Sequence, residues 1–146
     1  MGFLVLETCT QYCHCETMIV VYLCLKQQPM NIEEFHDHCL GKLGVTAEFP
    51  FDKTTLVFKV FGKMFALAGI ETFPSMNLKC DPERSIDLRE RYHGITPGFH
   101  MNKTHWNTVS TDGSVDDRLL EELINHSYDL VFASLTKKIR EEALGK

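Results

Sequence analysis

Residues 55–70 read TLVFKVFGKMFALAGI, and this stretch decides the fold. The runs 55–60 and 64–70 are rich in β-branched, aromatic and other apolar residues, which favour strands. Residues 61–63 (FGK) separate the two runs, and a glycine in such a short connection is typical of a β-hairpin. The stretch therefore predicts two antiparallel strands joined by a tight turn.

The chain after the hairpin predicts a further strand and a helix. Residues 75–79 form a short strand, and residues 81–83 (DPE) follow it. An acidic N-cap, a proline at the first helical position and an acid in the first turn all signal a helix start. We expect this helix to run to about Tyr92, because Gly94 stops it, and residues 95–98 to form a loop.

The C-terminal part predicts a last strand and one long helix. The strand covers residues 105–110, and Ser114 then caps the helix with Asp117 at its third position. The apolar face of the helix consists of Leu119, Leu120, Leu123, Ile124, Val131 and Leu135. The cations expected near its C-terminal end, where they suit the helix dipole, are Lys137, Lys138 and Arg140.

A first helix is expected before the hairpin. Asn31 is followed three residues later by Glu34, the pattern of an N-cap with its reciprocal partner, and apolar residues then recur with a helical period up to Gly44. Residues 48–52 (EFPFD) predict an extended segment, because Pro50 disfavours helix. The order is therefore α-β-β-β-β-α-β-α. It predicts an α+β fold, a two-layer sandwich in which terminal helices cover one face of an antiparallel sheet.

Composition and charge narrow the class of protein. The chain has 146 residues, of which 44% are hydrophobic and 24% charged, as in a soluble globular protein of one domain. The net charge of −5 excludes the whole-molecule basic field of a strong nucleic-acid binder. Any contact with DNA therefore has to come from a local patch.

Residues 1–29 differ in composition from the rest of the chain. They carry three charges and four of the six cysteines, and a helix-start signal follows directly after them. We expect Met30 to be the natural start and residues 1–29 to be an extension outside the domain of residues 30–146. The alternative is a genuine strand or helix at residues 17–25 that packs against the domain. Isolated thiols in the expected core and the lack of a membrane-length apolar run favour the cytoplasm.

Motifs for metal binding and catalysis are weak. Cys9, Cys13, His14 and Cys15 include ligand types that zinc prefers, but no second pair follows, and a free-thiol cluster is the favoured interpretation. Cys80 beside Asp81 is best read as a packed thiol, since a neighbouring carboxylate raises the pKa of a thiol. No nucleophile elbow, zinc-protease motif or phosphate loop is present in the sequence. We therefore expect no enzyme activity, no cofactor and no metal.

Residues 99–108 (FHMNKTHWNT) form the most polar and aromatic stretch. Such a mixture suits a recognition surface, where lysine meets phosphate and aromatic or imidazole rings stack on bases. The competing interpretation makes Trp106 a core anchor and the asparagines loop hydrogen-bonders. Basic residues on the hairpin and nearby strands are open to two interpretations as well, a wing-like basic edge or ordinary solvated lysines. The candidate nucleic-acid-binding residues are Lys59, Lys63, Lys79, Arg91, His100, Asn102, Lys103, His105 and Trp106.

Several stretches resemble the MmcQ/YjbR family of small bacterial proteins. They are EFPF (48–51), LVFKVFGKMFAL (56–67), NLKCDPE (77–83), LRERYHGITPGFHMNKTHWNTV (88–109) and LINHSYDLV (123–131). His93 stands where a proline is expected. The resemblance covers residues 30 to about 146 and implies a frataxin-like (CyaY-like) sandwich and a bacterial source. It also implies DNA binding through a double-wing arrangement of hairpins.

Two functions of different class follow. The first is a non-enzymatic DNA-binding module, a monomer that binds DNA through a local basic patch. The second is an acidic adaptor or small-ligand-binding protein with no nucleic-acid role, which the net charge favours. An iron-binding role is a third and weaker idea, because the first helix offers only Glu33, Glu34 and Asp37.

Overall fold

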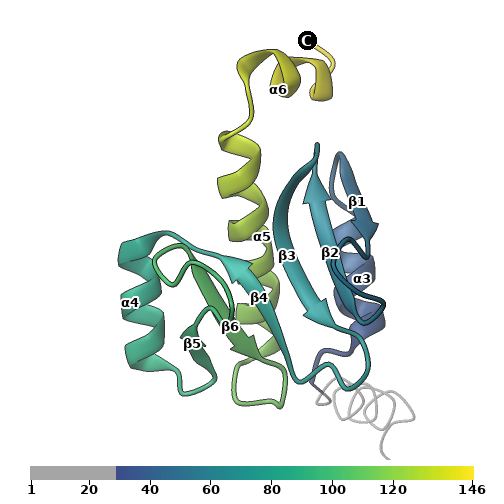
Figure 1. Cartoon of the computed structure of the whole chain (residues 1–146). Helices are drawn as coiled ribbons and strands as arrows, with labels where there is room; N and C mark the ends of the chain where they lie inside the picture. The colour runs from purple at the N-terminus through teal and green to yellow at the C-terminus, as the bar shows by residue number, and fades with distance from the viewer. Residues whose placement is uncertain (1–28) are drawn as a thin grey trace, which may run out of the picture.

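The structure is a computed structural model that describes residues 29–146, and Figure 1 shows its ribbon. Six strands form one antiparallel sheet in the order β1-β2-β3-β4-β6-β5. The strands are β1 (Val45–Glu48), β2 (Thr55–Val60), β3 (Lys63–Gly69), β4 (Ser75–Lys79), β5 (Ile95–Pro97) and β6 (Trp106–Ser110). The helices of the described part are α3 (Ile32–Leu40), α4 (Pro82–Arg91), α5 (Asp117–Ala133) and α6 (Lys137–Ala143).

The predicted hairpin forms as β2 and β3. Its turn places Phe61 at φ 45° and Gly62 at φ 85°, both in the left-handed region. Two consecutive residues with positive φ match the right-handed twist of the flanking strands, which is why such turns dominate short hairpins. The hairpin prediction is therefore confirmed.

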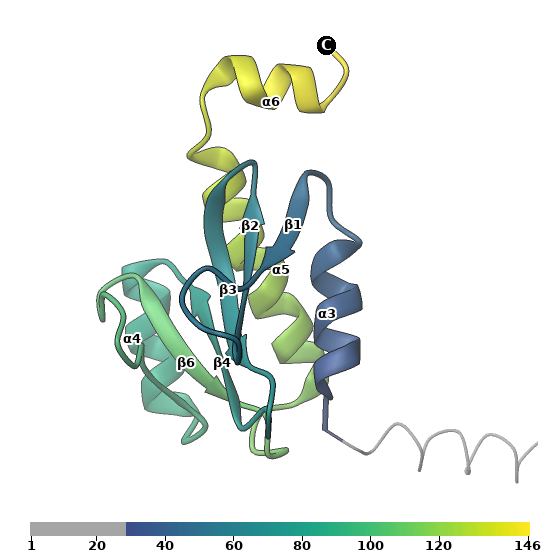
Figure 2. The same ribbon diagram turned by 45° about the vertical axis from the view of Figure 1, so that its right-hand side comes forward.

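Helices α3 and α5 pack on the same face of the sheet, as Figures 1 and 2 show. Phe35 of α3 is fully buried, and its ring centroid lies 5.1 Å from that of Phe58 on β2 and 5.4 Å from that of Phe73. Leu120 and Ile124 of α5 are also fully buried in this core. The predicted α+β sandwich of two layers is confirmed.

Ser127 fixes α5 to the middle of the sheet. Its side chain is completely buried, and its hydroxyl donates to the carbonyl oxygen of Phe65 on β3 and accepts from the backbone N–H of Lys79 on β4. Both backbone groups are thereby satisfied inside the core, where an unpaired polar group is costly. One serine thus sets the position of the helix over two strands.

Both predicted helix starts before the last strand are confirmed. Asn31 and Glu34 form a capping box, with each side chain accepting from the other residue's backbone N–H. Asp81 caps α4 by accepting from the N–H groups of Glu83 and Arg84, and Pro82 is the first helical residue.

The predicted single C-terminal helix is wrong in two respects. Asp116, not Ser114, is the N-cap of α5, and Ser114 instead donates its N–H to Asp112. The helix also ends at Ala133, and a second helix, α6, begins at Lys137. The break follows from Thr136, whose hydroxyl caps α6, and from Leu135, which turns into the core and is buried. The basic residues at 137 and 138 therefore lie in the first turn of α6 rather than at the end of one long helix.

Three boundaries of the sheet layer also differ from the prediction. The first helix ends at Leu40, and Gly44 at φ 72° serves the turn into β1 instead of ending the helix. The strand before the hairpin is Val45–Glu48 rather than residues 48–52. Residues 95–97, expected in a loop, pair with β6 as the edge strand β5. Residues 95–97 become a strand because their backbone forms hydrogen bonds with β6, and local sequence propensity cannot reveal such a distant partner.

Cys39 and Cys80 are free and buried, as predicted, and burial raises the pKa of Cys39 to about 12. The interpretations of residues 1–28, namely the thiol or zinc cluster, the extension and the alternative strand or helix, lie outside the described residues. From residue 29 onward, no helix combines the length and the hydrophobicity needed to cross a membrane.

Candidate binding surface

Within residues 29–146, no helix packs on one of the two faces of the sheet, and we call this the open face. Strand register places on it the residues that alternate with the core-facing ones. They are Thr46 and Glu48 on β1, Thr55, Val57 and Lys59 on β2, Met64, Leu67 and Gly69 on β3, Ser75, Asn77 and Lys79 on β4, Thr96 on β5, and Trp106, Thr108 and Ser110 on β6. Most of these side chains are polar, so the open face presents hydrogen-bonding groups instead of a second core.

A groove of about 480 Å³ runs over the middle of the open face, and we call it the central groove. Leu67, Gly69 and Asn77 contribute to its floor, and Phe51 and Phe99 line its sides. The two aromatic side chains are 69% and 68% exposed, respectively, which is far more than phenylalanine usually shows. Exposed apolar side chains that gather around a hollow mark a site of interaction.

The loop that carries Phe99 is held over the sheet by a hydrogen-bond chain. The hydroxyl of Thr108 donates to Asn77 Oδ1 at 2.6 Å and accepts from the N–H of Phe99 at 2.9 Å. His100, next along the chain, has φ 57°, a left-handed conformation that costs free energy in a residue with a Cβ atom. The surrounding bonds therefore impose a defined conformation on this wall of the groove.

Asp52 gives the groove a fixed negative charge. Its Oδ1 accepts from the N–H groups of Thr54 at 2.8 Å and Thr55 at 2.6 Å, and its Oδ2 accepts from the Thr55 hydroxyl at 3.0 Å. The backbone hydrogen bonds, and then those of the threonine hydroxyls, hold the pKa of Asp52 below its usual value. Asp52 is therefore ionised at neutral pH, and within residues 29–146 it takes part in no salt bridge.

Arg89 anchors the same loop from helix α4. Its Nε donates to Asn107 Oδ1 at 2.8 Å, and its Nη2 donates to the carbonyl oxygens of Trp106, at 3.1 Å, and of Lys103. Asn107 is 2% exposed, so this bond satisfies a buried amide oxygen. Sequence reasoning missed Arg89, because nothing local distinguishes it from Arg84 or Arg91 on the same helix.

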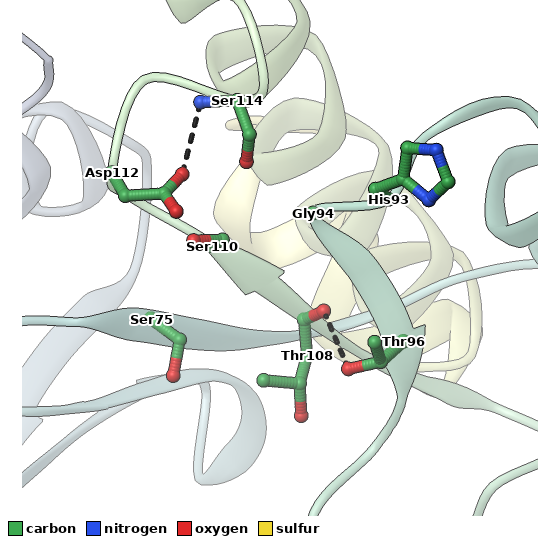
Figure 3. Close-up of a pocket in the computed structure, with 8 residues that line it drawn as sticks. All are labelled: Ser75, His93, Gly94, Thr96, Thr108, Ser110, Asp112 and Ser114. Carbon is green, nitrogen blue, oxygen red and sulfur yellow. Dashed lines mark hydrogen bonds between the residues drawn. The ribbon is translucent and has the colours of Figure 1, made fainter.

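A second hollow of about 240 Å³ lies beside the central groove, and we call it the hydroxyl hollow. Figure 3 shows its lining, which comprises Ser75, His93, Gly94, Thr96, Thr108, Ser110, Asp112 and Ser114. Hydrogen bonds, foremost from the side chain and backbone of Ser114, lower the pKa of Asp112. Ser75 borders both hollows, so the two are neighbours on the open face. Sequence reasoning missed this hollow too, because its hydroxyls come from three strands and from the loop after β6.

The structure brings some of the predicted DNA-binding residues together at one end of the sheet. Lys59, Lys63 and Lys79 lie on the neighbouring strands β2, β3 and β4 towards the end that carries the β2–β3 turn. His105 shares a small hollow with Lys79 there. We call these four residues the basic end.

Each lysine of the basic end already has a partner in the protein. Lys59 forms an ion pair with Glu48, and Lys63 Nζ donates to the carbonyl oxygen of Ser134 at 3.0 Å. Lys79 Nζ lies 5.5 Å from the centre of the Trp106 ring, within cation–π range.

The other predicted residues lie apart from the basic end or are engaged elsewhere. Arg91 pairs with Asp87 on the exposed side of α4 at 3.0 Å, and Asn102 accepts from the N–H of Thr104 at 2.9 Å. Lys103 contributes its carbonyl oxygen to Arg89, and His100 lines the central groove. Trp106 is 5% exposed, but it lies on the open face with Lys79 over its ring and outside the core cluster beneath the helices.

Fold and surface together define an α+β sandwich whose helices occupy one sheet face and leave the other hollowed and polar. The model of the YjbR family matches residues 40–130 of the chain. This chain belongs to the YjbR family.

Similar proteins support this membership. The uncharacterised protein YbdF of Escherichia coli O157:H7 is 41% identical over 91 residues, which are 62% of this chain and 75% of that protein. The uncharacterised protein YjbR of Escherichia coli K12 is 32% identical over 113 residues, or 77% of this chain and 96% of that protein. The structure of protein DR2400 of Deinococcus radiodurans, a DUF419 domain, superposes with a TM-score of 0.74 at 40% identity, covering 80% of this chain and 89% of that one. A Pseudomonas syringae protein gives a TM-score of 0.59 at 31% identity, with 69% and 98% covered.

Proposed function

We propose that this protein is a non-enzymatic binding protein and that a small ligand occupies the central groove. The observation that carries the proposal is the pair of solvent-exposed phenylalanines, Phe51 and Phe99, at the sides of one hollow. The groove has the size of ligand pockets in general, roughly 300–1,000 Å³. Its lining also has their character, with apolar groups such as Leu67 and a few polar groups such as Asn77 and Asp52.

The wall around Phe99 supports the proposal because it is already formed. The bonds of Thr108 and Asn77 hold the loop without a ligand, so little conformational entropy has to be lost on binding. The charge balance adds support, since the carboxylate of Asp52 lies in the groove and the chain as a whole carries a net charge of −5. A polyanion is poorly suited to such a surface.

A fragment screen by NMR of the full chain tests the proposal. We expect bound compounds to shift the backbone amides of Phe51, Gly69 and Phe99 together. The variant Gly69→Leu is expected to lower the affinity for each such compound at least about tenfold, because the leucine side chain occupies part of the groove. A tenfold loss of affinity corresponds to about 1.4 kcal/mol of binding free energy. A Cβ at Gly69 meets no atom within 4 Å, so the fold should tolerate the leucine. The variant Ile86→Ala on α4, which removes an exposed apolar side chain outside the groove, is the matched control. Unchanged affinity in Gly69→Leu, or compounds that shift only other regions, would contradict the proposal.

DNA binding is the second candidate function, and the basic end favours it. Three lysines on neighbouring strands gather cations at one end of the sheet, Lys59 and Lys79 on the open face and Lys63 on the side of α5. A phosphate backbone that crosses this end can meet them, provided that their present partners are exchanged for phosphate. Neutralising three phosphates implies a salt dependence with a log–log slope of about −2.7, at roughly −0.9 per phosphate on duplex DNA.

Fluorescence anisotropy with labelled duplex and single-stranded DNA, at about 50 and 200 mM salt, decides on this candidate. Lys63→Glu is expected to weaken binding. Arg118→Glu, an exposed residue in the first turn of α5 and at the other end of that helix from Ser134, is expected to leave it unchanged. A lack of binding to either form of DNA at the lower salt concentration excludes the second candidate.

A further inference from the structure

Two exposed aromatic side chains, Phe51 and Phe99, line the central groove. Phe51 precedes β2 and Phe99 precedes β6, and strands β3 and β4 lie between β2 and β6 in the sheet. The two rings therefore approach the groove from opposite sides and leave the floor residues Leu67 and Gly69 between them. Aromatic walls of this kind stack on planar heteroaromatic rings irrespective of the detailed ring structure.

The charge in the groove selects a ring with hydrogen-bond donors. Asp52 is ionised, and among residues 29–146 it accepts hydrogen bonds from Thr54 and Thr55 alone, so its carboxylate has acceptor capacity left for a ligand. Asn77 adds an amide to the floor, although its side chain is partly engaged with Thr108 and Phe99. An exocyclic amino group on the ring is the complementary donor.

The hydroxyl hollow accounts for a second part of the same ligand. It adjoins the central groove at Ser75 and combines several serine and threonine hydroxyls with the carboxylate of Asp112, as Figure 3 shows. Hydroxyls act as donors and as acceptors, and a carboxylate accepts from them, so this lining matches a hydroxylated group such as a sugar. The lowered pKa of Asp112 keeps the hollow negative, which disfavours a phosphate.

We propose that the open face binds an amino-bearing nucleoside without phosphate. The base lies between Phe51 and Phe99 with its amino group towards Asp52, and the sugar lies in the hydroxyl hollow beside Asp112. This proposal rests on the proposed function, since it names the ligand class of the central groove and extends the site into its neighbour.

Isothermal titration of the full chain with adenosine, uridine and AMP tests the ligand class. We expect adenosine to bind, uridine to bind at least about fivefold more weakly because it lacks the amino group, and AMP at least about tenfold more weakly because of its charge. Phe99→Ala is expected to reduce adenosine affinity about tenfold through the lost stacking. Asp112→Asn is expected to reduce the difference in affinity between adenosine and AMP, because it removes a negative charge from the hydroxyl hollow. Ile86→Ala is the control, and we expect its affinities for all three compounds to be unchanged.

The outcomes separate this inference from the proposed function. The nucleoside proposal is overturned if AMP binds as tightly as adenosine. It is also overturned if Asp112→Asn does not change the ratio of the affinities for adenosine and AMP. If no nucleoside binds while fragments still shift the amides of the groove, the ligand class is wrong and the groove remains a binding site. If neither nucleosides nor fragments shift these amides, both proposals fail.

Discussion

Replacing Phe35 by alanine is expected to destabilise the protein by about 4 kcal/mol, the usual cost of truncating a buried phenylalanine. The side chain has no exposed surface, and its ring touches Phe58 edge-on and Phe73 at a tilt. Its removal leaves a cavity where α3 meets the sheet, and the aromatic cluster also loses its geometry-specific contacts. Such a loss is a large share of the roughly 5–15 kcal/mol that stabilise a domain.

Urea denaturation followed by far-UV circular dichroism measures this effect. The control is Phe51→Ala, since that ring is mostly exposed and its removal should change the free energy of unfolding by less than about 0.5 kcal/mol. A loss below about 1.5 kcal/mol for Phe35→Ala would show that α3 is not packed on the sheet as described.

Replacing Arg89 by leucine is expected to cost about 3 kcal/mol, because a charged hydrogen-bond donor is removed from a buried acceptor. Asn107 is almost completely buried, and its Nδ2 has no hydrogen-bond partner among residues 29–146. The loss of Arg89 would therefore remove the one partner that these residues give its side chain. The carbonyl oxygen of Trp106 loses a donor as well. We also expect the loop around Phe99 to become mobile, since its end near Lys103 would no longer be tied to α4.

The matched control for Arg89→Leu is Arg91→Leu on the same helix. Arg91 forms an exposed ion pair with Asp87, and such pairs contribute about 0–1 kcal/mol. A double-mutant cycle with Asn107→Leu isolates the pairwise interaction from the packing of each side chain. Equal losses for Arg89→Leu and Arg91→Leu would contradict the anchoring role.

Local signals in the sequence predicted those elements whose start or turn depends on residues close in the chain. The hairpin followed from one glycine between two apolar runs, and the starts of α3 and α4 followed from Asn31 and Asp81. The resemblance to a family implied the sandwich arrangement, which the sheet and its helices confirm. The match to the YjbR family model confirms the resemblance itself.

Elements that depend on distant partners were missed or misplaced. β5 is three residues long and ends in a proline, so its strand character comes only from pairing with β6. The break between α5 and α6 follows from the burial of Leu135 in the core. The apolar periodicity of the sequence does not reveal this break, because Leu135 also fits the apolar face of one continuous helix. The hydrogen bond of Lys63 to the carbonyl oxygen of Ser134 joins residues 71 positions apart and has no local signal either.

The central groove depends on tertiary arrangement even more strongly. Phe51 and Phe99 are 48 positions apart, from 51 to 99, and nothing in either local sequence indicates that they flank one hollow. The same holds for Asp112 and the hydroxyls beside it, which look like loop and strand residues when each is read alone. Binding surfaces on an open sheet face are therefore the part of this fold that a single sequence reveals least.

The two outer strands of the sheet, β1 and β5, bear on how this chain behaves at high concentration. An outer strand offers unpaired backbone groups to which a strand of another molecule can add, the first step of fibrillar aggregation. Here β1 has only four residues and β5 three, and Pro97 in β5 has no N–H to donate. Both borders are thus poor templates for strand addition, so the ends of this sheet resist joining those of another molecule.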